Sequence, residues 1–97
     1  MQWAPLPALL DDLAESAGLS KQAVGEVVDD LEELGYVERA QDPLDGRAKV
    51  IKLTGRGADA HRTALGIFAD IEQDLMERYG AERVKTMRKL LEEIASG

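Results

Sequence analysis

The chain has 97 residues, of which 44% are hydrophobic and 32% charged, a balance typical of one soluble globular domain rather than a disordered segment. It contains no cysteine, which excludes disulfides and thiolate chemistry, and no apolar run approaches the roughly 20 residues needed to span a bilayer. Its start lacks the basic and apolar segments of a signal peptide, so we expect a cytoplasmic protein.

The net charge of −7 argues at first sight against a nucleic-acid partner, because phosphate binding normally requires a basic surface. The charge is unevenly distributed, however. Residues 1–35 hold eight acidic side chains and one cation, Lys21, whereas residues 36–57 hold five cations and three acidic side chains. The central segment therefore leaves nucleic-acid binding open.

Two helices come first along the chain. Apolar residues recur at helical spacing over residues 7–17, and Gly18 then fits a left-handed helix cap. Ser20 suits the N-cap of a second helix, which carries an apolar stripe as far as Leu34. Two helices joined by a tight glycine turn indicate a helix-turn-helix.

A hairpin is expected next. Residues 36–40 and 48–53 resemble two short strands, and the polar segment between them contains Pro43 and Gly46, which favour a turn. The spacing thus predicts a protruding hairpin beside the helix-turn-helix.

Two C-terminal helices follow. Thr54 is placed to cap a long helix reaching Tyr79, about 26 residues and roughly 39 Å at 1.5 Å per residue. Gly80 then separates it from a last helix. We expect the apolar stripes of both helices to lack cover within one subunit and to pair in a symmetric dimer. The expected dimer-interface residues are Leu65, Phe68, Leu75, Tyr79, Val84, Met87, Leu90, Leu91 and Ile94.

The predicted fold is therefore mainly α with a small β-hairpin: a winged helix-turn-helix followed by two C-terminal dimerisation helices. We divide it into a DNA-binding part, residues 1–57, and a helical dimerisation part, residues 58–97, within one continuous domain.

The outer face of the second helix carries the main functional signal. Lys21 lies in the first turn, where the helix dipole disfavours a cation, and insertion into the major groove would explain this placement. By their hydrogen-bonding groups, Gln22 can contact adenine, Lys21 guanine and Glu26 cytosine. Gly25, without a side chain, would allow the helix to approach a base closely. Glu26 and Asp29 would repel phosphate, and the alternative is a solvated face on a packing helix.

The hairpin supplies a second candidate contact. An arginine at its tip, Arg47, can enter the minor groove, where narrow A·T-rich sequences concentrate negative potential. Asp45 either holds that guanidinium or shapes the turn, and Lys49 and Lys52 lie on the strand behind it. The alternative is a simple turn with solvated charges.

No catalytic or metal site can be assembled from this sequence. His61 is the single histidine, without a cysteine or a carboxylate pair at ligand spacing, and residues 55–57 fit no phosphate-binding loop. We therefore expect no enzyme activity, no metal and no cofactor.

The run LAESAGLSKQAVGEVVDDLEELGYVER, followed by DPLDGRAKVIKLTGRG, resembles the core of the MarR family of bacterial regulators. The likeness is close over residues 8–57 and looser over the two last helices, which in that family form most of the dimer interface. Family members usually carry one or two further helices ahead of this point. The resemblance therefore implies an N-terminally short member and gives only weak support for a small-molecule effector, whose cleft those helices help to build.

The resemblance also assigns roles to individual residues. It implies that Arg47 enters the minor groove and that Asp45 braces the wing, residues 41–47. It also implies that four residues face the major groove: Ser20, Lys21, Gln22 and Gly25. Three further residues are expected to contact phosphates: Arg39, Lys49 and Arg56.

The leading hypothesis is a sequence-specific DNA-binding transcription regulator, a repressor, that binds a pseudo-palindromic operator as a homodimer. The alternative is a protein-interaction and dimerisation module that binds little DNA of its own and pairs with another regulator. The charge of −7 favours the alternative, and the cations at positions 21 and 47 favour the regulator.

Overall fold

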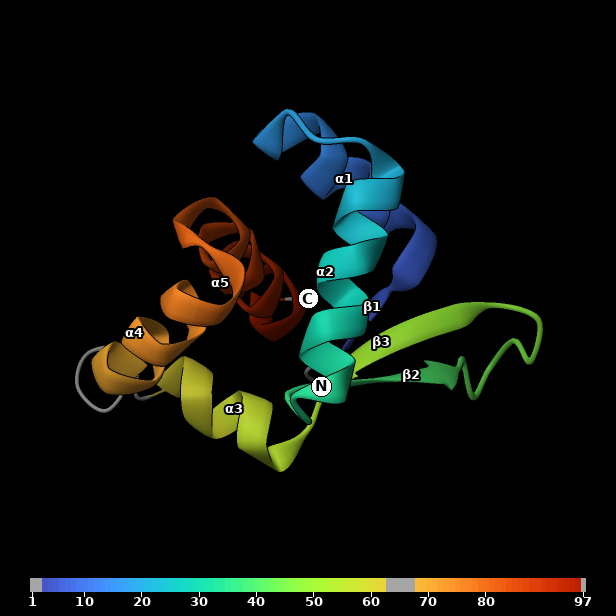
Figure 1. Cartoon of the computed structure of the whole chain (residues 1–97). Helices are drawn as coiled ribbons and strands as arrows, with labels where there is room; N and C mark the ends of the chain where they lie inside the picture. Colours follow the sequence, from blue (N-terminus) through green and yellow to red (C-terminus); the bar gives the residue numbers. More distant parts are fainter. Residues whose placement is uncertain (1–2, 63–67, 97) are drawn as a thin grey trace.

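The structure is a computed structural model that describes residues 3–62 and 68–96, with the side chains of residues 61–72 left undescribed. The elements run in chain order as shown in Figure 1. They are β1 (Trp3–Pro5), α1 (Leu6–Ala17), α2 (Lys21–Glu33), β2 (Val37–Gln41), β3 (Lys49–Leu53), α3 (Gly55–Arg62), α4 (Phe68–Tyr79) and α5 (Ala81–Ser96). The predicted class, a mainly helical winged helix-turn-helix with further C-terminal helices, is confirmed.

The helix-turn-helix forms as the sequence predicted. Gly18 adopts the left-handed conformation with φ 68°, and the backbone N–H of Leu19 donates to the Ala14 carbonyl at 2.9 Å. The hydroxyl oxygen of Ser20 then accepts from the Ala23 N–H at 3.0 Å and begins α2. A left-handed cap and a serine N-cap two residues apart thus fix the turn between α1 and α2.

The sheet has one more strand than expected. Its order is β1-β3-β2, with both pairings antiparallel, so the predicted hairpin of β2 and β3 is extended by β1 on the other edge of β3. In this register Ala4 lies opposite Ile51, and both are buried. The three residues of β1 end in Pro5 and carry no strand signal of their own. This strand therefore forms because the free edge of β3 is available for pairing.

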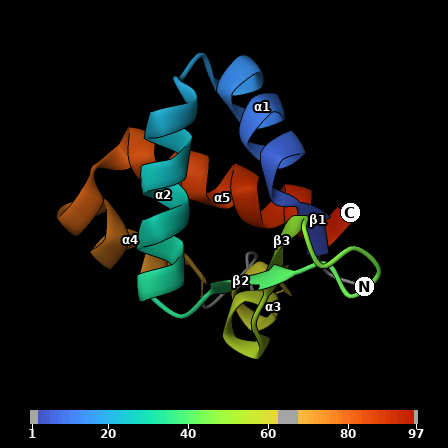
Figure 2. The same ribbon diagram turned by 90° about the vertical axis from the view of Figure 1, so that its right-hand side faces the viewer.

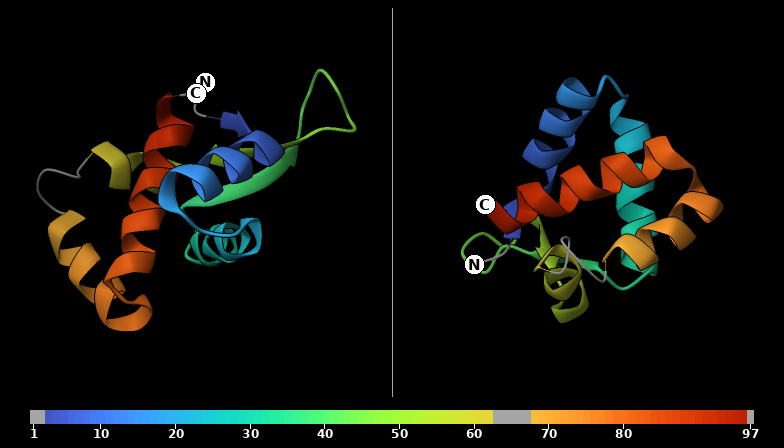
Figure 3. Two further views of the ribbon diagram at one scale, coloured as in Figure 1. Left: turned by 90° about the horizontal axis from the view of Figure 1, so that it is seen from above. Right: turned by 90° about the vertical axis from the view of Figure 1, so that its left-hand side faces the viewer.

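The last helix packs against its own chain. Figure 3 shows α5 crossing one side of the molecule from α4 towards β1, and Figure 2 shows it behind α1 and α2. Gly80, with φ 89°, reverses the chain between α4 and α5. The apolar side chains of α5 are at most 3% exposed: Val84, Met87, Leu90, Leu91 and Ile94. The expectation that this stripe lacks cover within one subunit is therefore wrong.

The long helix expected from Thr54 to Tyr79 is replaced by two helices. α3 and α4 lie either side of residues 63–67, and Figure 3 shows that their axes diverge, so they do not form one straight rod. Leu75 of α4 is 5% exposed and belongs to the common core, against which Tyr79 also packs. Leu65 lies outside the described residues, as do the side chains of His61 and Phe68.

The start of α3 is locked to the end of the helix-turn-helix. The Thr54 hydroxyl donates to the Gly35 carbonyl at 2.6 Å and accepts from the Gly57 N–H at 3.0 Å, which confirms Thr54 as the helix cap. A β-carbon built on Gly57 would lie 1.9 Å from the Tyr36 carbonyl oxygen. α3 and the Tyr36 backbone therefore approach so closely that position 57 has room only for a hydrogen.

This contact makes Gly57→Ala a strong test of the fold. We expect the variant to lose about 3 kcal/mol of unfolding free energy, the upper end for overpacking, because the obstacle is backbone rather than a flexible side chain. Gly55→Ala in the same helix is the matched control, since its β-carbon would meet nothing within 4 Å. It should stay within about 1 kcal/mol of the parent. Urea unfolding followed by circular dichroism measures both, and equal stability of the two variants would refute the close contact.

Candidate nucleic-acid interface

Helix α2 presents one face to the core and the other to solvent. Val24, Val27, Val28 and Leu31 are at most 3% exposed and face α1, α5 and the sheet. At 100° per residue the opposite side carries Gln22, Glu26, Asp29 and Glu33, with Gly25 beside them, and the four longer side chains are exposed. The face expected to read base edges is therefore free of contacts with the core.

Lys21 has a partner within the chain that the sequence did not reveal. Its ammonium lies 2.7 Å from a carboxylate oxygen of Asp11 on α1, and both side chains are more than half exposed. The argument that only DNA docking explains a cation in this first turn is thereby corrected. An exposed pair of this kind contributes about 0–1 kcal/mol, so it leaves Lys21 able to exchange Asp11 for a phosphate.

Arg39 of β2 is held by α2, the second helix of the helix-turn-helix. Its two terminal nitrogens donate to Asp29 at 2.6 Å and to Glu32 at 2.7 Å, and its backbone N–H donates to the other Glu32 oxygen at 3.2 Å. Partial burial lowers the pKa of Arg39, but the bonds and charges of Asp29 and Glu32 outweigh it and raise the pKa overall. Arg39 therefore partly neutralises α2 and docks β2 against it, while its expected phosphate contact stays a prediction.

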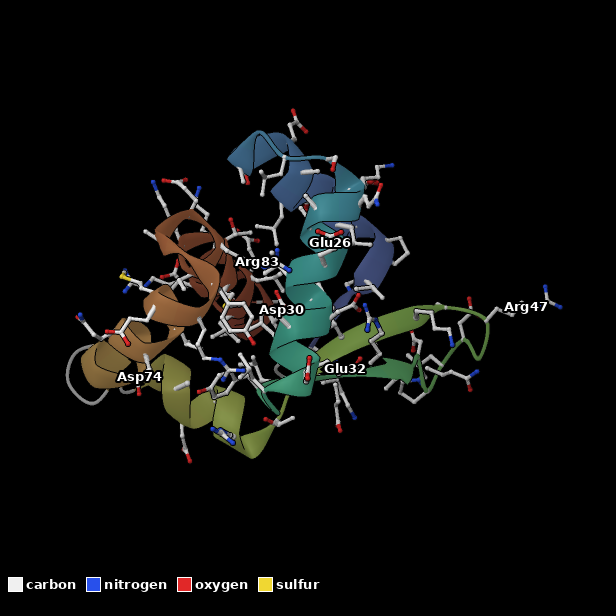
Figure 4. The ribbon with its side chains drawn as sticks, in the orientation of Figure 1. Glu26, Asp30, Glu32, Arg47, Asp74 and Arg83 are labelled. Atoms are coloured by element: carbon white, nitrogen blue, oxygen red, sulfur yellow. The ribbon has the colours of Figure 1, made fainter. Side chains whose placement is uncertain are left out.

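Arg83 of α5 provides a second link to α2, shown in Figure 4. Its Nε lies 2.5 Å from a carboxylate oxygen of Asp30, whose side chain is only 16% exposed. The hydrogen bond to Asp30 raises the pKa of Arg83, and the nearby charge of Glu26 acts in the same direction. Arginines of β2 and α5 thus compensate three of the five carboxylates on α2. Sequence reasoning missed these pairs because each joins two different elements, and Arg83 lies 53 positions from Asp30.

The wing is shaped by two aspartates acting on the backbone. A carboxylate oxygen of Asp45 accepts from the Arg47 N–H at 3.1 Å, and one of Asp42 accepts from the Leu44 N–H at 2.9 Å. Of the two roles considered for Asp45, the structure therefore shows the turn-forming one. The Arg47 side chain is exposed at the tip, as Figure 4 shows, and has no ion pair with any residue that the structure describes.

The remaining cations of the wing region differ in their availability. Lys49 is exposed on β3, whereas the ammonium of Lys52 lies 4.0 Å from Glu38 across the sheet. The guanidinium of Arg56 lies 5.0 Å from the centre of the Tyr36 ring, a cation–π contact that orients it on the surface. Arg47 and Lys49 are thus the wing cations best placed to meet DNA.

A groove of about 440 Å³ runs between the helix-turn-helix and α5. Its apolar floor includes Ala17, Ala23 and Val27, and Arg83 and Lys85 lie on the α5 side. Any molecule bound there would touch both α2 and α5.

Neither a metal site nor a membrane-spanning helix is found in the described part of the chain. Within it, no group of three or more histidine, cysteine, aspartate or glutamate side chains is arranged to hold a metal ion. No helix in the same residues is both long enough and apolar enough to cross a membrane.

A helix-turn-helix with an exposed second helix, followed by an antiparallel hairpin with an arginine at its tip, defines a winged helix-turn-helix protein. Residues 6–48, from α1 to the end of the wing loop, match the MarR family. The match supports a DNA-binding transcription regulator of the winged helix-turn-helix class. No curated protein and no solved structure shows a significant match to the chain.

The Arg39 contacts lead to a prediction about stability. Arg39→Ala and Glu32→Ala should each lower the free energy of unfolding by about 1 kcal/mol, because each removes the pairing that joins β2 to α2. In the double variant the losses should fall short of additivity by about 0.5–1 kcal/mol. Urea unfolding of the three variants completes the cycle. The matched control is Lys52→Ala with Glu38→Ala, whose 4.0 Å separation predicts almost no coupling. Additive losses for Arg39 and Glu32 would contradict the interaction.

Proposed function

We propose that this protein is a sequence-specific transcription regulator, a repressor, that places α2 in the major groove and the wing at the minor groove of a pseudo-palindromic operator. One observation carries the proposal. The chain itself engages Arg39 and Arg56, whereas Arg47 pairs with no described residue and projects from the tip of a hairpin beside α2. An unpaired guanidinium at that position matches the negative potential of a narrow minor groove.

Within this proposal the first turn of α2 makes the base contacts. Ser20 caps the helix and sets how it enters the groove, and Gln22 and Lys21 reach adenine and guanine. Glu26 accepts from cytosine, which restricts binding to sites that offer an amino group there. Lys49 adds a phosphate contact behind the wing. These assignments follow from exposure and side-chain chemistry together.

Two copies would bind the two half-sites, with recognition helices about 34 Å apart, one turn of the DNA helix. The buried stripe of α5 is excluded as their interface, so pairing must use other surfaces or form on the operator. Repression follows when the operator overlaps the promoter, because the bound dimer then blocks polymerase. Sedimentation with and without duplex distinguishes a pre-formed dimer from one assembled on DNA.

The first test is a titration of the protein against its own upstream promoter duplex and a scrambled duplex at several salt concentrations. We expect the promoter to bind more tightly, with affinity falling steeply as salt rises, because phosphate contacts release counterions. Arg47→Ala should weaken promoter binding about tenfold. Arg78→Ala is the matched control, because this arginine lies on α4 against the Tyr79 ring, away from the wing. Equal affinity for both duplexes at every salt would rule the proposal out.

Gly25 provides an independent test of close approach. A β-carbon at this position would meet nothing within 4 Å, so the fold has no packing reason for glycine there. Gly25→Ala should therefore raise the free energy of unfolding by up to about 1 kcal/mol through helix propensity. If α2 enters the major groove, the same variant should bind the promoter duplex more weakly than the parent. Thermal unfolding and duplex titration give the two readings, and unchanged DNA affinity would show that Gly25 does not face the groove closely.

A second candidate, a protein-interaction module, is favoured by the charge of the recognition helix. α2 carries five carboxylates and one lysine, and Glu26 and Glu33 project on its exposed side. Such a surface suits a basic region of another regulator as partner. Failure to bind any duplex at low salt, together with a salt-sensitive complex with such a partner, would favour this reading.

The groove between α2 and α5 is the candidate site for a small effector. Its contact with both helices means that a ligand could change how α2 is held through the Arg83–Asp30 pair. Promoter binding measured with and without added candidate anions tests that role.

A further inference from the structure

The wing tip exposes a large apolar side chain. Leu44 is 94% exposed, against 37% for Leu19 and 41% for Met76, the other exposed large hydrophobic residues in the part of the chain that the structure describes. It follows Pro43 and stands three residues before Arg47, in the loop between β2 and β3, which projects away from the helices in Figure 1. At this exposure the Leu44 side chain contributes almost nothing to the packing of the described residues.

The backbone around Leu44 is held in place. Its N–H donates to Asp42, and the backbone N–H of Asp42 donates to the Ala48 carbonyl at 3.0 Å. On the other side of the tip the Ala48 N–H donates to the Asp45 carbonyl at 3.0 Å, and the Asp45 side chain accepts from Arg47. These four hydrogen bonds close the turn, so Leu44 and Arg47 are presented together on one small ordered loop.

We propose that Leu44 inserts into the minor groove beside Arg47 and contributes to a preference for A·T pairs at the position that the wing contacts. The inference rests on the proposed function and adds a specificity-determining residue to it. In the minor groove a G·C pair differs from A·T by the guanine amino group, a donor that an apolar side chain cannot satisfy. Leu44 would therefore disfavour G·C there, whereas Arg47 supplies the electrostatic attraction.

The size and surroundings of Leu44 favour DNA over protein as its partner. A stable protein interface needs about 800 Å² from each partner, and here a single leucine is flanked by one proline, one glycine and charged residues. The minor groove, about 6 Å wide, accepts one inserted side chain, and leucine is among the apolar residues that minor-groove proteins insert. The neighbouring Lys49 matches a phosphate beside the groove that Arg47 enters.

The experiment uses an operator duplex that the full chain selects from a random-sequence pool. Footprinting of the parent and of Arg47→Ala identifies the base pair that the wing protects, and that pair is then made A·T, G·C or inosine·C. Inosine·C keeps the G·C pairing but lacks the minor-groove amino group. We expect the parent to bind A·T and inosine·C alike and G·C about tenfold more weakly.

Leu44→Ser should lower affinity for the A·T duplex about five- to tenfold, from the loss of one buried leucine contact, and should reduce the discrimination against G·C. Its thermal unfolding should match the parent because the side chain is exposed. Met76→Ser is the matched control, an exposed apolar residue on α4 away from the wing, and should leave DNA binding unchanged.

The possible failures can be told apart. If Leu44→Ser binds all three duplexes like the parent while Arg47→Ala is weakened, the Leu44 inference is overturned and the proposed function stands. If Leu44→Ser instead abolishes self-association in sedimentation without changing DNA affinity, the leucine serves a protein contact. If the pool yields no selected duplex, the proposed function itself fails and this inference with it.

Discussion

The fold depends on the burial of α5 against its own helix-turn-helix. The apolar stripe of this helix contacts α1, α2, α3, α4 and the sheet, so it completes a core that the short winged helix-turn-helix could not close alone. The same packing brings Arg83 to Asp30 and sets one wall of the groove beside α2. The orientation of the recognition helix is therefore decided as much by the C-terminus as by the turn that precedes it.

Electrostatic compensation is the second constraint. Five carboxylates on α2 would repel DNA if their charges were unopposed, but arginines of β2 and α5 bind three of them, Asp29, Glu32 and Asp30. Because these ion pairs are partly exposed, they contribute modestly to the free energy of unfolding. Their larger effect is to make the electrostatic potential at the exposed face of α2 less negative. Among the described residues, Arg47 and Lys49 form no ion pair, and under the proposed function they supply the attraction for phosphate.

Local signals in the sequence predicted the local structure well. The Gly18 cap, the Ser20 N-cap and the Thr54 cap each depend on residues within a few positions, and all three are observed. Each strand of the hairpin begins one residue later than predicted. The β1 strand was missed because it pairs with β3, about 47 residues away. Its three residues, which end in Pro5, are too few to show the alternation of apolar and polar residues typical of a strand.

The helix-turn-helix, the wing and the exposed residues of α2 could be predicted from the order of residues, because capping and hydrophobic periodicity are properties of neighbouring positions. The surface that covers the last helix could not be predicted, since an apolar stripe indicates that a helix needs a partner surface but not which surface. The tertiary structure likewise decided that Arg39 faces Asp29 and Glu32 rather than solvent, and that position 57 must be glycine. Those outcomes depend on contacts between segments that the order of residues does not bring together.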